Sequence, residues 1–143
     1  MTQEAVTGAY RRQHAEIDRL VASLLDLLNS PDAPQRLFDA RALLTALDSA
    51  VDTHLTLEAQ GLYPRLLAHA DPDLRAAAAR CREETSGLRP VFRSYVDEWT
   101  DISAIGNRFG TFRAETRAVL ARLDSRMRRE REELFPELDR LGW

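Results

Sequence analysis

His54 and Glu58 are separated by one turn of an α-helix, which places both side chains on the same helix face. Upstream, Leu44, Leu47 and Val51 recur at alternating steps of three and four residues, and this stripe continues onto the two polar residues. The face that carries them is therefore otherwise apolar and directed toward a core. An unpaired polar group in a core costs on the order of 2–7 kcal/mol. An internal partner is accordingly expected: a metal ion, a hydrogen-bonded counter-charge, or both.

The segment that carries this pair recurs in the second half of the chain. The sequence Leu62-Tyr63-Pro64 returns 72 residues later as Leu134-Phe135-Pro136. The two halves are therefore interpreted as related helix pairs, each with one polar core position on its first helix and two on its second. In this register the polar positions pair as His14 with Thr85, His54 with Arg126, and Glu58 with Glu130.

Apolar stripes at helical spacing predict the elements that must position these residues. They indicate helices over about residues 3–29, 34–69, 72–99 and 109–141, with Pro64 and Pro90 bending the second and third helices. Asp71 is expected to cap the third helix, with a proline at its first helical position. Residues 100–107 are expected to form a loop, with Ser103 or Asn107 as the next cap.

Long amphipathic helices joined by short loops predict an all-α fold. The expected architecture is an antiparallel up-down-up-down four-helix bundle with a two-fold internal repeat of helix pairs. The alternating steps of three and four residues indicate coiled-coil-like packing. The chain of 143 residues is expected to form a single domain over residues 1–143, with repeat halves at about 1–70 and 71–143.

Composition restricts the classes of partner. The net charge of −3 gives no electrostatic basis for nucleic-acid binding, and no segment approaches the ~18 apolar residues of a spanning helix. Neither nucleic acid nor a membrane is therefore expected as a partner. One cysteine excludes an internal disulfide framework and, with no signal-peptide pattern, predicts a cytoplasmic location. All 20 Lys/Arg residues are arginine, so a buried one must be paired because it cannot be neutralised.

With these motifs in place, the chain resembles the hemerythrin-like superfamily, the HHE cation-binding domains, over almost its whole length. The resemblance rests on the histidine of the first helix, the His-x3-Glu spacing, and the Leu-aromatic-Pro segment that closes helices two and four. In that family each half supplies one His and then His-x3-Glu, and the six residues hold two irons with bridging carboxylates. The resemblance implies metal ligands at His14, His54, Glu58 and Glu130, with the second half-site replaced by Thr85 and Arg126.

These two replacements favour occupancy by at most one metal ion. Thr85 is a poor ligand, and Arg126 has no lone pair to offer. The two glutamates and the arginine leave the cluster with one net negative charge, so one divalent ion is tolerable and two would leave +3 in a low-dielectric core. The nitrogen and oxygen ligands suit iron, zinc or manganese.

Two interpretations of function remain open from the sequence. The favoured one is a small soluble binding or sensing protein with an incomplete di-iron site, which holds at most one metal ion, or a small ligand, in the bundle core. The alternative is a metal-free helical scaffold or interaction protein in which Arg126 forms a buried salt-bridge network with Glu58 and Glu130. A third and less favoured interpretation is that the polar core binds a small anion on Arg126. A protein partner or a homodimer is compatible with each interpretation.

Enzymatic turnover is less expected than binding or sensing, because no phosphate loop, nucleophile elbow or Cys-x-x-Cys pair is present. Cys81 is interpreted as a small buried hydrophobe rather than a redox group. Glu84 could turn inward as a substitute ligand, although a solvated position is the preferred interpretation. His69 is interpreted as a surface residue at a helix end.

Overall fold

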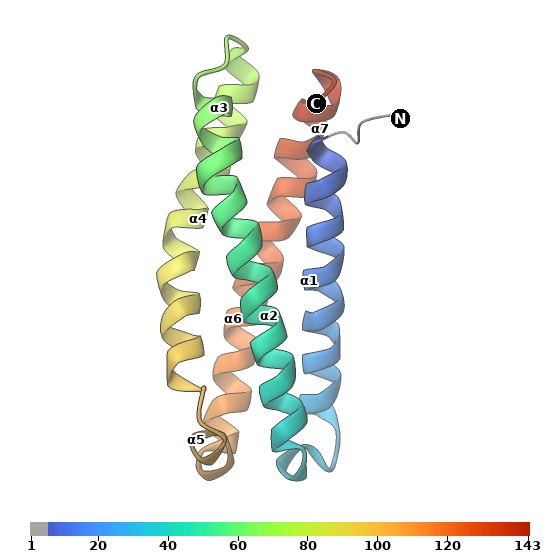
Figure 1. The fold of residues 1–143 in the computed structure, drawn as a ribbon, viewed down its shortest axis with the longest axis vertical. Helices are drawn as coiled ribbons and strands as arrows, with labels where there is room; N and C mark the ends of the chain where they lie inside the picture. Colours follow the sequence, from blue (N-terminus) through green and yellow to red (C-terminus); the bar gives the residue numbers. More distant parts are fainter. Residues whose placement is uncertain (1–5) are drawn as a thin grey trace.

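The computed structural model describes residues 6–143, apart from the side chain of residue 85. Long helical segments lie side by side along one axis, and the chain runs down, up, down and up, so that both ends lie at the same end of the bundle (Figure 1). The fold is therefore the predicted all-α antiparallel bundle. Its helices are α1 (Val6–Asn29), α2 (Leu37–Leu57), α3 (Tyr63–Leu67), α4 (Pro72–Glu98), α5 (Ile102–Asn107), α6 (Phe109–Arg129) and α7 (Phe135–Arg140), with a 3-10 turn at Ala33–Gln35.

Two π-helical turns interrupt the second and fourth long segments. The turns are η2 (Glu58–Leu62), before Pro64, and η3 (Glu130–Leu134), before Pro136. A proline has no N–H, and its ring clashes with the carbonyl four residues earlier, so an α-helix cannot continue through it unchanged. The helical turn instead includes one more residue, so that the Glu58 carbonyl accepts a hydrogen bond from the Tyr63 N–H five residues later. The bend expected at Pro64 therefore takes the form of a π turn.

The start of α4 agrees with the sequence prediction. The Asp71 side chain accepts hydrogen bonds from the N–H groups of Asp73 at 2.9 Å and Leu74 at 3.0 Å, and Pro72 is the first helical residue. These bonds satisfy two of the N–H groups that a helix leaves unpaired at its beginning. The helix then continues through Pro90 to Glu98.

The prediction of a loop over residues 100–107 is wrong, because most of this segment forms the short helix α5. Its N-cap is Asp101, whose carboxylate accepts from the Ser103 N–H at 2.9 Å. Neither Ser103 nor Asn107 caps a helix, since both lie within α5. Ile105 is fully buried against the bundle end, so packing stabilises a helix too short to form by itself.

The predicted start of the first helix at residue 3 lies outside the described residues. Within residues 6–143, no helix is long and apolar enough to cross a membrane.

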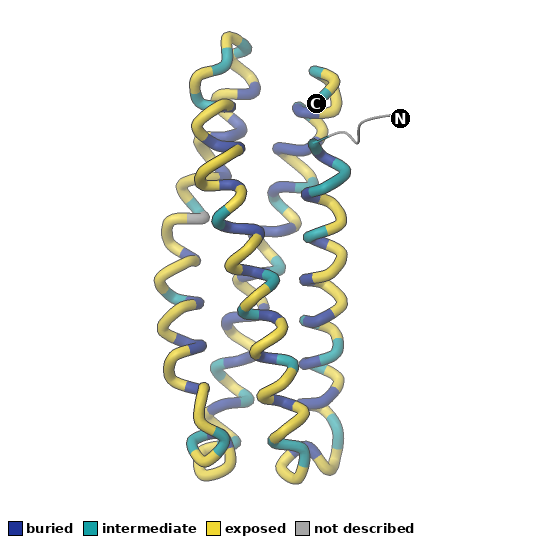
Figure 2. The backbone as a smooth tube through the Cα atoms, in the orientation of Figure 1, coloured by how far each residue is buried: buried dark blue, intermediate teal, exposed yellow. Residues whose placement is uncertain are grey.

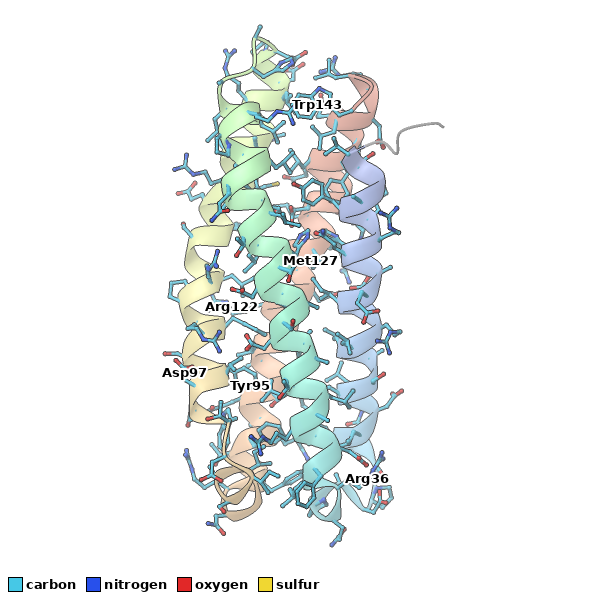
Figure 3. The ribbon with its side chains drawn as sticks, viewed as in Figure 1. Arg36, Tyr95, Asp97, Arg122, Met127 and Trp143 are labelled. Atoms are coloured by element: carbon cyan, nitrogen blue, oxygen red, sulfur yellow. The ribbon has the colours of Figure 1, made fainter. Side chains whose placement is uncertain are left out.

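The apolar core consists of two clusters, with buried residues along the inner faces of the helices (Figure 2). Charged side chains such as Arg122 and Asp97 project from the outside, whereas Met127 lies between the helices (Figure 3). A polar layer separates the two clusters: Tyr10 and Ile17, one turn to either side of His14 on α1, belong to different clusters. The buried members of this layer are His14, His54, Glu58, Arg126 and Glu130.

Candidate metal centre

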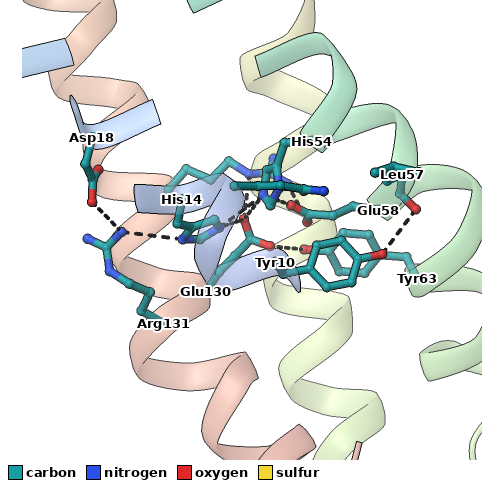
Figure 4. A network of polar contacts seen from close by, with 11 residues as sticks. Tyr10, His14, Asp18, His54, Leu57, Glu58, Tyr63, Glu130 and Arg131 are labelled. Atoms are coloured by element: carbon teal, nitrogen blue, oxygen red, sulfur yellow. Dashed lines mark hydrogen bonds and ion pairs between the residues drawn. The ribbon is translucent and has the colours of Figure 1, made fainter. Parts of the chain in front are cut away.

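Four metal-ligating side chains from four segments converge in this polar layer. His14 comes from α1, His54 from α2, and Glu58 and Glu130 are the first residues of the two π turns. One ligand atom of each side chain lies within 4.8 Å of all the others, and none of the four residues is more than 1% exposed. Figure 4 shows the two imidazoles facing the carboxylates across the bundle interior.

The inner ring nitrogens of the histidines point toward each other and toward one carboxylate. The Nε2 atoms of His14 and His54 are 3.0 Å apart. Glu130 Oε1 lies 3.5 Å from the first and 3.4 Å from the second, and Glu58 Oε1 is in close contact with His54 Nε2. Two imidazole nitrogens and two carboxylate oxygens around one point form a ligand set typical of a divalent transition metal.

Groups outside the cluster orient the two histidines. Gln13 Oε1 accepts a hydrogen bond of 2.7 Å from His54 Nδ1, so the lone pair of Nε2 can face the cluster when that nitrogen is deprotonated. On the far side, Arg131 Nη1 lies 3.4 Å from His14 Nδ1 and 3.2 Å from Asp18 Oδ2 (Figure 4). The sequence interpretation did not include Gln13, although its position directly before His14 was visible in the sequence.

Arg126 enters the cluster from α6 and is only 3% exposed. Its Nη2 donates a hydrogen bond of 3.2 Å to Glu58 Oε2, and its Nε lies 3.5 Å from Glu130 Oε1. The guanidinium therefore stands beside both glutamates, but only the contact with Glu58 has hydrogen-bond geometry. Nε and Nη1 are buried without a hydrogen-bond partner.

The two glutamates differ in their protonation. Burial, followed by the negative charge of Glu130, raises the pKa of Glu58 to about 7, although His54 acts in the opposite direction. Burial would also raise the pKa of Glu130, but hydrogen bonds from Glu58 and both histidines, with the charge of Arg126, lower it well below the usual range. In the metal-free protein, Glu130 therefore keeps its negative charge and Glu58 is the carboxylate that more readily holds a proton.

The two histidines also differ. Burial lowers the pKa of His14, which is therefore neutral at pH 7. Burial acts in the same direction on His54, but hydrogen bonds and charges from Glu130 and Glu58 outweigh it and raise the pKa to about 9. In the metal-free protein, a protonated His54 thus supplies part of the positive charge that a cation would bring.

Two tyrosines border the cluster on the side of α3. Tyr63 is buried, and its hydroxyl donates to Glu130 Oε2 at 3.4 Å. The Tyr10 ring stands edge-on to the His54 ring at 5.8 Å, and its hydroxyl lies 3.5 Å from the Leu57 carbonyl oxygen. The sequence analysis used Tyr63 only as part of the repeated Leu-aromatic-Pro motif. The equivalent Phe135 has no hydroxyl, so this difference between the halves was the available signal.

Three further residues considered from the sequence do not join the cluster. Glu84 forms an ion pair with Arg129 and does not take a ligand position. Cys81 is buried, and burial raises the pKa of its thiol to about 12, as expected for a hydrophobic rather than a redox role. His69 Nδ1 accepts from the Asp71 N–H at 3.0 Å. The side chain of Thr85 lies outside the described part of the structure.

The chemistry of these residues fits a metal ion. Glu58 Oε1 makes no hydrogen bond of regular geometry and is in close contact with His54 Nε2, which is itself a ligand candidate, so both atoms are available to a shared cation. Arg126 lies beside Glu58 in the same layer, and its guanidinium has no lone pair to offer as a metal ligand. Within residues 6–143, this is the one group of three or more His, Cys, Asp or Glu side chains with the spacing of a metal site.

One comparison with known proteins supports a cation-binding role for this cluster. Searches of curated proteins and of solved structures gave no significant match. The model of the hemerythrin HHE cation-binding domain family matches residues 6–138, which include all four ligand candidates and both prolines that follow the π turns. The chain therefore belongs to the hemerythrin HHE cation-binding domain family.

Proposed function

We propose that this protein binds one divalent transition-metal ion through His14, His54, Glu58 and Glu130 and acts as a binding or sensing protein rather than an enzyme. The observation that carries the proposal is the convergence of four buried ligand atoms within 4.8 Å of one another. Iron is the ion that the family resemblance favours, and zinc or manganese suits the same ligands.

Charge supports a single ion. With neutral imidazoles, the two carboxylates and the Arg126 guanidinium leave one net negative charge in the layer. One divalent ion changes this to one net positive charge, whereas two ions would give +3 in a site with almost no exposure to water. A single ion also leaves the Arg126–Glu58 hydrogen bond intact.

A bound ion would supply a Lewis-acidic centre in a water-poor interior. The chain's own residues would hold it and fix its orientation. Gln13 keeps the His54 ring in place, and Tyr63 donates to the Glu130 oxygen that faces away from the histidines. Such a site, with an arginine where the family has a second set of ligands, supports binding and sensing better than two-metal oxygen chemistry.

Metal analysis of protein purified without a histidine tag tests the proposal. After anaerobic loading with iron(II) and desalting, we expect about one equivalent of metal, lost in His54→Ala and in Glu58→Ala. His69→Ala is the matched control, because its histidine lies outside the cluster, and it should retain the metal. Less than about a tenth of an equivalent of any transition metal in the loaded protein would overturn the proposal.

A sensing role predicts, in addition, that metal binding changes the backbone dynamics of the protein. Both π turns begin with a ligand candidate, so metal binding should slow backbone hydrogen exchange in Glu58–Leu62 and Glu130–Leu134. Exchange in the distant helix α5 should not change. An identical exchange pattern with and without bound metal would contradict a sensing role while leaving metal binding itself intact.

The second candidate is a metal-free scaffold or interaction protein, and the contacts of Arg126 with Glu58 and Glu130 favour it. In that case the charges of Arg126 and a protonated His54 balance the two carboxylates without a metal ion. Protein that contains no metal after loading, and whose Tm does not change with EDTA or with iron(II), would establish this candidate over the first.

A further inference from the structure

A surface pocket that the proposed metal site does not use lies between the η2–α3 segment and α4. It has a volume of about 730 Å³, within the range of roughly 300–1,000 Å³ in which small-molecule sites fall. The facing segments are labelled α3 and α4 in Figure 1. The pocket opens on the outside of the bundle, and its inner wall includes Tyr63, whose hydroxyl is turned away toward Glu130.

The floor of the pocket is apolar. Ala59, Pro64 and Leu67 line it from the η2–α3 side, and Pro90 lines it from α4. The two prolines carry no N–H, so this apolar part of the lining offers a ligand no side-chain hydrogen-bond donor. Because the Tyr63 hydroxyl is engaged in the polar layer, its ring adds a further apolar surface. Such a floor favours a hydrocarbon chain over a polar molecule.

The rim is basic. Arg82, Arg89 and Arg93 recur at helical spacing along α4 and all line the pocket. Arg89 donates to Asp52 Oδ1 at 3.2 Å and to Thr56 at 3.0 Å. Arg93 is likewise engaged, with Asp48 at 3.2 Å and Asp97 at 3.3 Å.

Arg82 differs from these two arginines. It is exposed, and it has no hydrogen bond or ion pair with any residue that the structure describes. Asp52 is the one acidic residue among those that line the pocket, and Arg89 already pairs with it. The rim therefore presents excess positive charge and one guanidinium that can accept a new anionic partner. A guanidinium matches a carboxylate through two parallel N–H donors.

We infer that this pocket binds an amphipathic monocarboxylate of the fatty-acid class, with its carboxylate on Arg82 and its hydrocarbon chain against Pro64, Leu67 and Pro90. The inference is independent of the proposed metal site. Each further buried methylene should strengthen binding about fourfold. A neutral alcohol of the same length should bind more weakly, and a cationic amphiphile should be repelled.

The test is a calorimetric titration of the full chain with laurate, 1-dodecanol and dodecyltrimethylammonium, each below its micellar concentration. We expect saturable binding of laurate, about tenfold weaker binding of dodecanol, and no binding of the cation. Decanoate, which is two methylenes shorter, should bind about 15-fold more weakly than laurate. Absence of saturable laurate binding, or equal binding of all three headgroups, would overturn the inference.

Variants locate the site. Arg82→Ala should weaken laurate binding about tenfold and leave dodecanol unaffected. Arg41→Ala is the matched control, because Arg41 is also exposed and has no ion pair among the described residues but lies on α2 away from the pocket. Ser86→Trp, at an exposed position of α4 that lines the pocket, should block laurate and dodecanol alike. Equal losses in Arg82→Ala and Arg41→Ala, with all variants folded by circular dichroism, would contradict the assignment.

Discussion

Arg126 Nη2 donates a hydrogen bond of 3.2 Å to Glu58 Oε2, and this bond joins the second half of the chain to the first across the bundle interior. The residue that replaces a histidine in the repeat register therefore contacts the glutamate of the other half. The bond brings a permanent positive charge into a layer whose other members are two histidines and two carboxylates. The stability of the metal-free protein is expected to depend on this bond.

Replacing Arg126 by methionine should destabilise the metal-free protein. Both glutamates would lose a buried cationic partner, and removal of one member of a buried ion pair costs roughly 3–5 kcal/mol. The measurement is urea unfolding in the presence of EDTA, with the free energy of unfolding compared between variant and wild type. Arg128→Met is the control, because its ion pair with Asp124 is exposed and should contribute less than about 1 kcal/mol. Equal changes in the free energy of unfolding for the two substitutions would show that the buried ion pair stabilises the protein no more than the exposed one.

Replacing Gln13 by alanine should weaken metal binding without abolishing it. Gln13 Oε1 accepts from His54 Nδ1 at 2.7 Å, and loss of such an orienting contact typically costs 10–100-fold in metal affinity. Competition with a chelator of known affinity measures the change. Gln13→Glu should retain or raise the affinity, since a carboxylate is also an acceptor, and Gln35→Ala, at an exposed position, is the control. The proposed role is wrong if alanine and glutamate at position 13 give the same affinity.

Introducing histidine at positions 85 and 126 together should restore a second metal site. The double variant Thr85→His, Arg126→His supplies the two imidazoles that the family pattern has and this chain lacks. It also removes the guanidinium from the polar layer. We expect metal content to rise from about one to about two equivalents of iron after anaerobic loading. Arg126→His alone should not reach this content. A double variant that folds and gains no metal would argue against the register between the two halves.

The cap at Asp71 should make stability depend on pH in the acidic range. Hydrogen bonds from the Leu74 N–H and from Arg140 lower the pKa of Asp71 below that of the unfolded chain. A group with a lowered folded pKa contributes its stability above its unfolded pKa, about 3.9, and loses it as pH falls through the folded value. The Tm difference between wild type and Asp71→Ala should therefore be constant from about pH 6 to 8 and shrink below about pH 4.

Asp73→Ala serves as the control for this measurement, because Asp73 lies in the first turn of the same helix but Asp71 is the residue that caps it. A Tm difference for Asp71→Ala that stays constant down to about pH 3 would show that the carboxylate charge at the cap does not matter.

The sequence by itself determined which residues face the core and where α4 begins. His54 and Glu58 lie on one face because the helical period places residues four apart on the same side, whatever the rest of the chain does. The cap at Asp71 is equally local, since a side chain and the N–H groups two and three residues later suffice to form it. The repeat placed Glu130 and Arg126 in the same layer because both halves use the same spacing.

Tertiary structure decided the relative axial positions of the helices. These positions in turn decide which side chains of distant segments are in contact. Gln13 meets His54 and Tyr63 meets Glu130 only because of the axial positions of α1, α2 and α6, which no spacing within one helix specifies. The helix α5 forms because Ile105 is buried by other helices. Local periodicity is a property of the backbone, whereas contact between helices depends on how whole surfaces fit together.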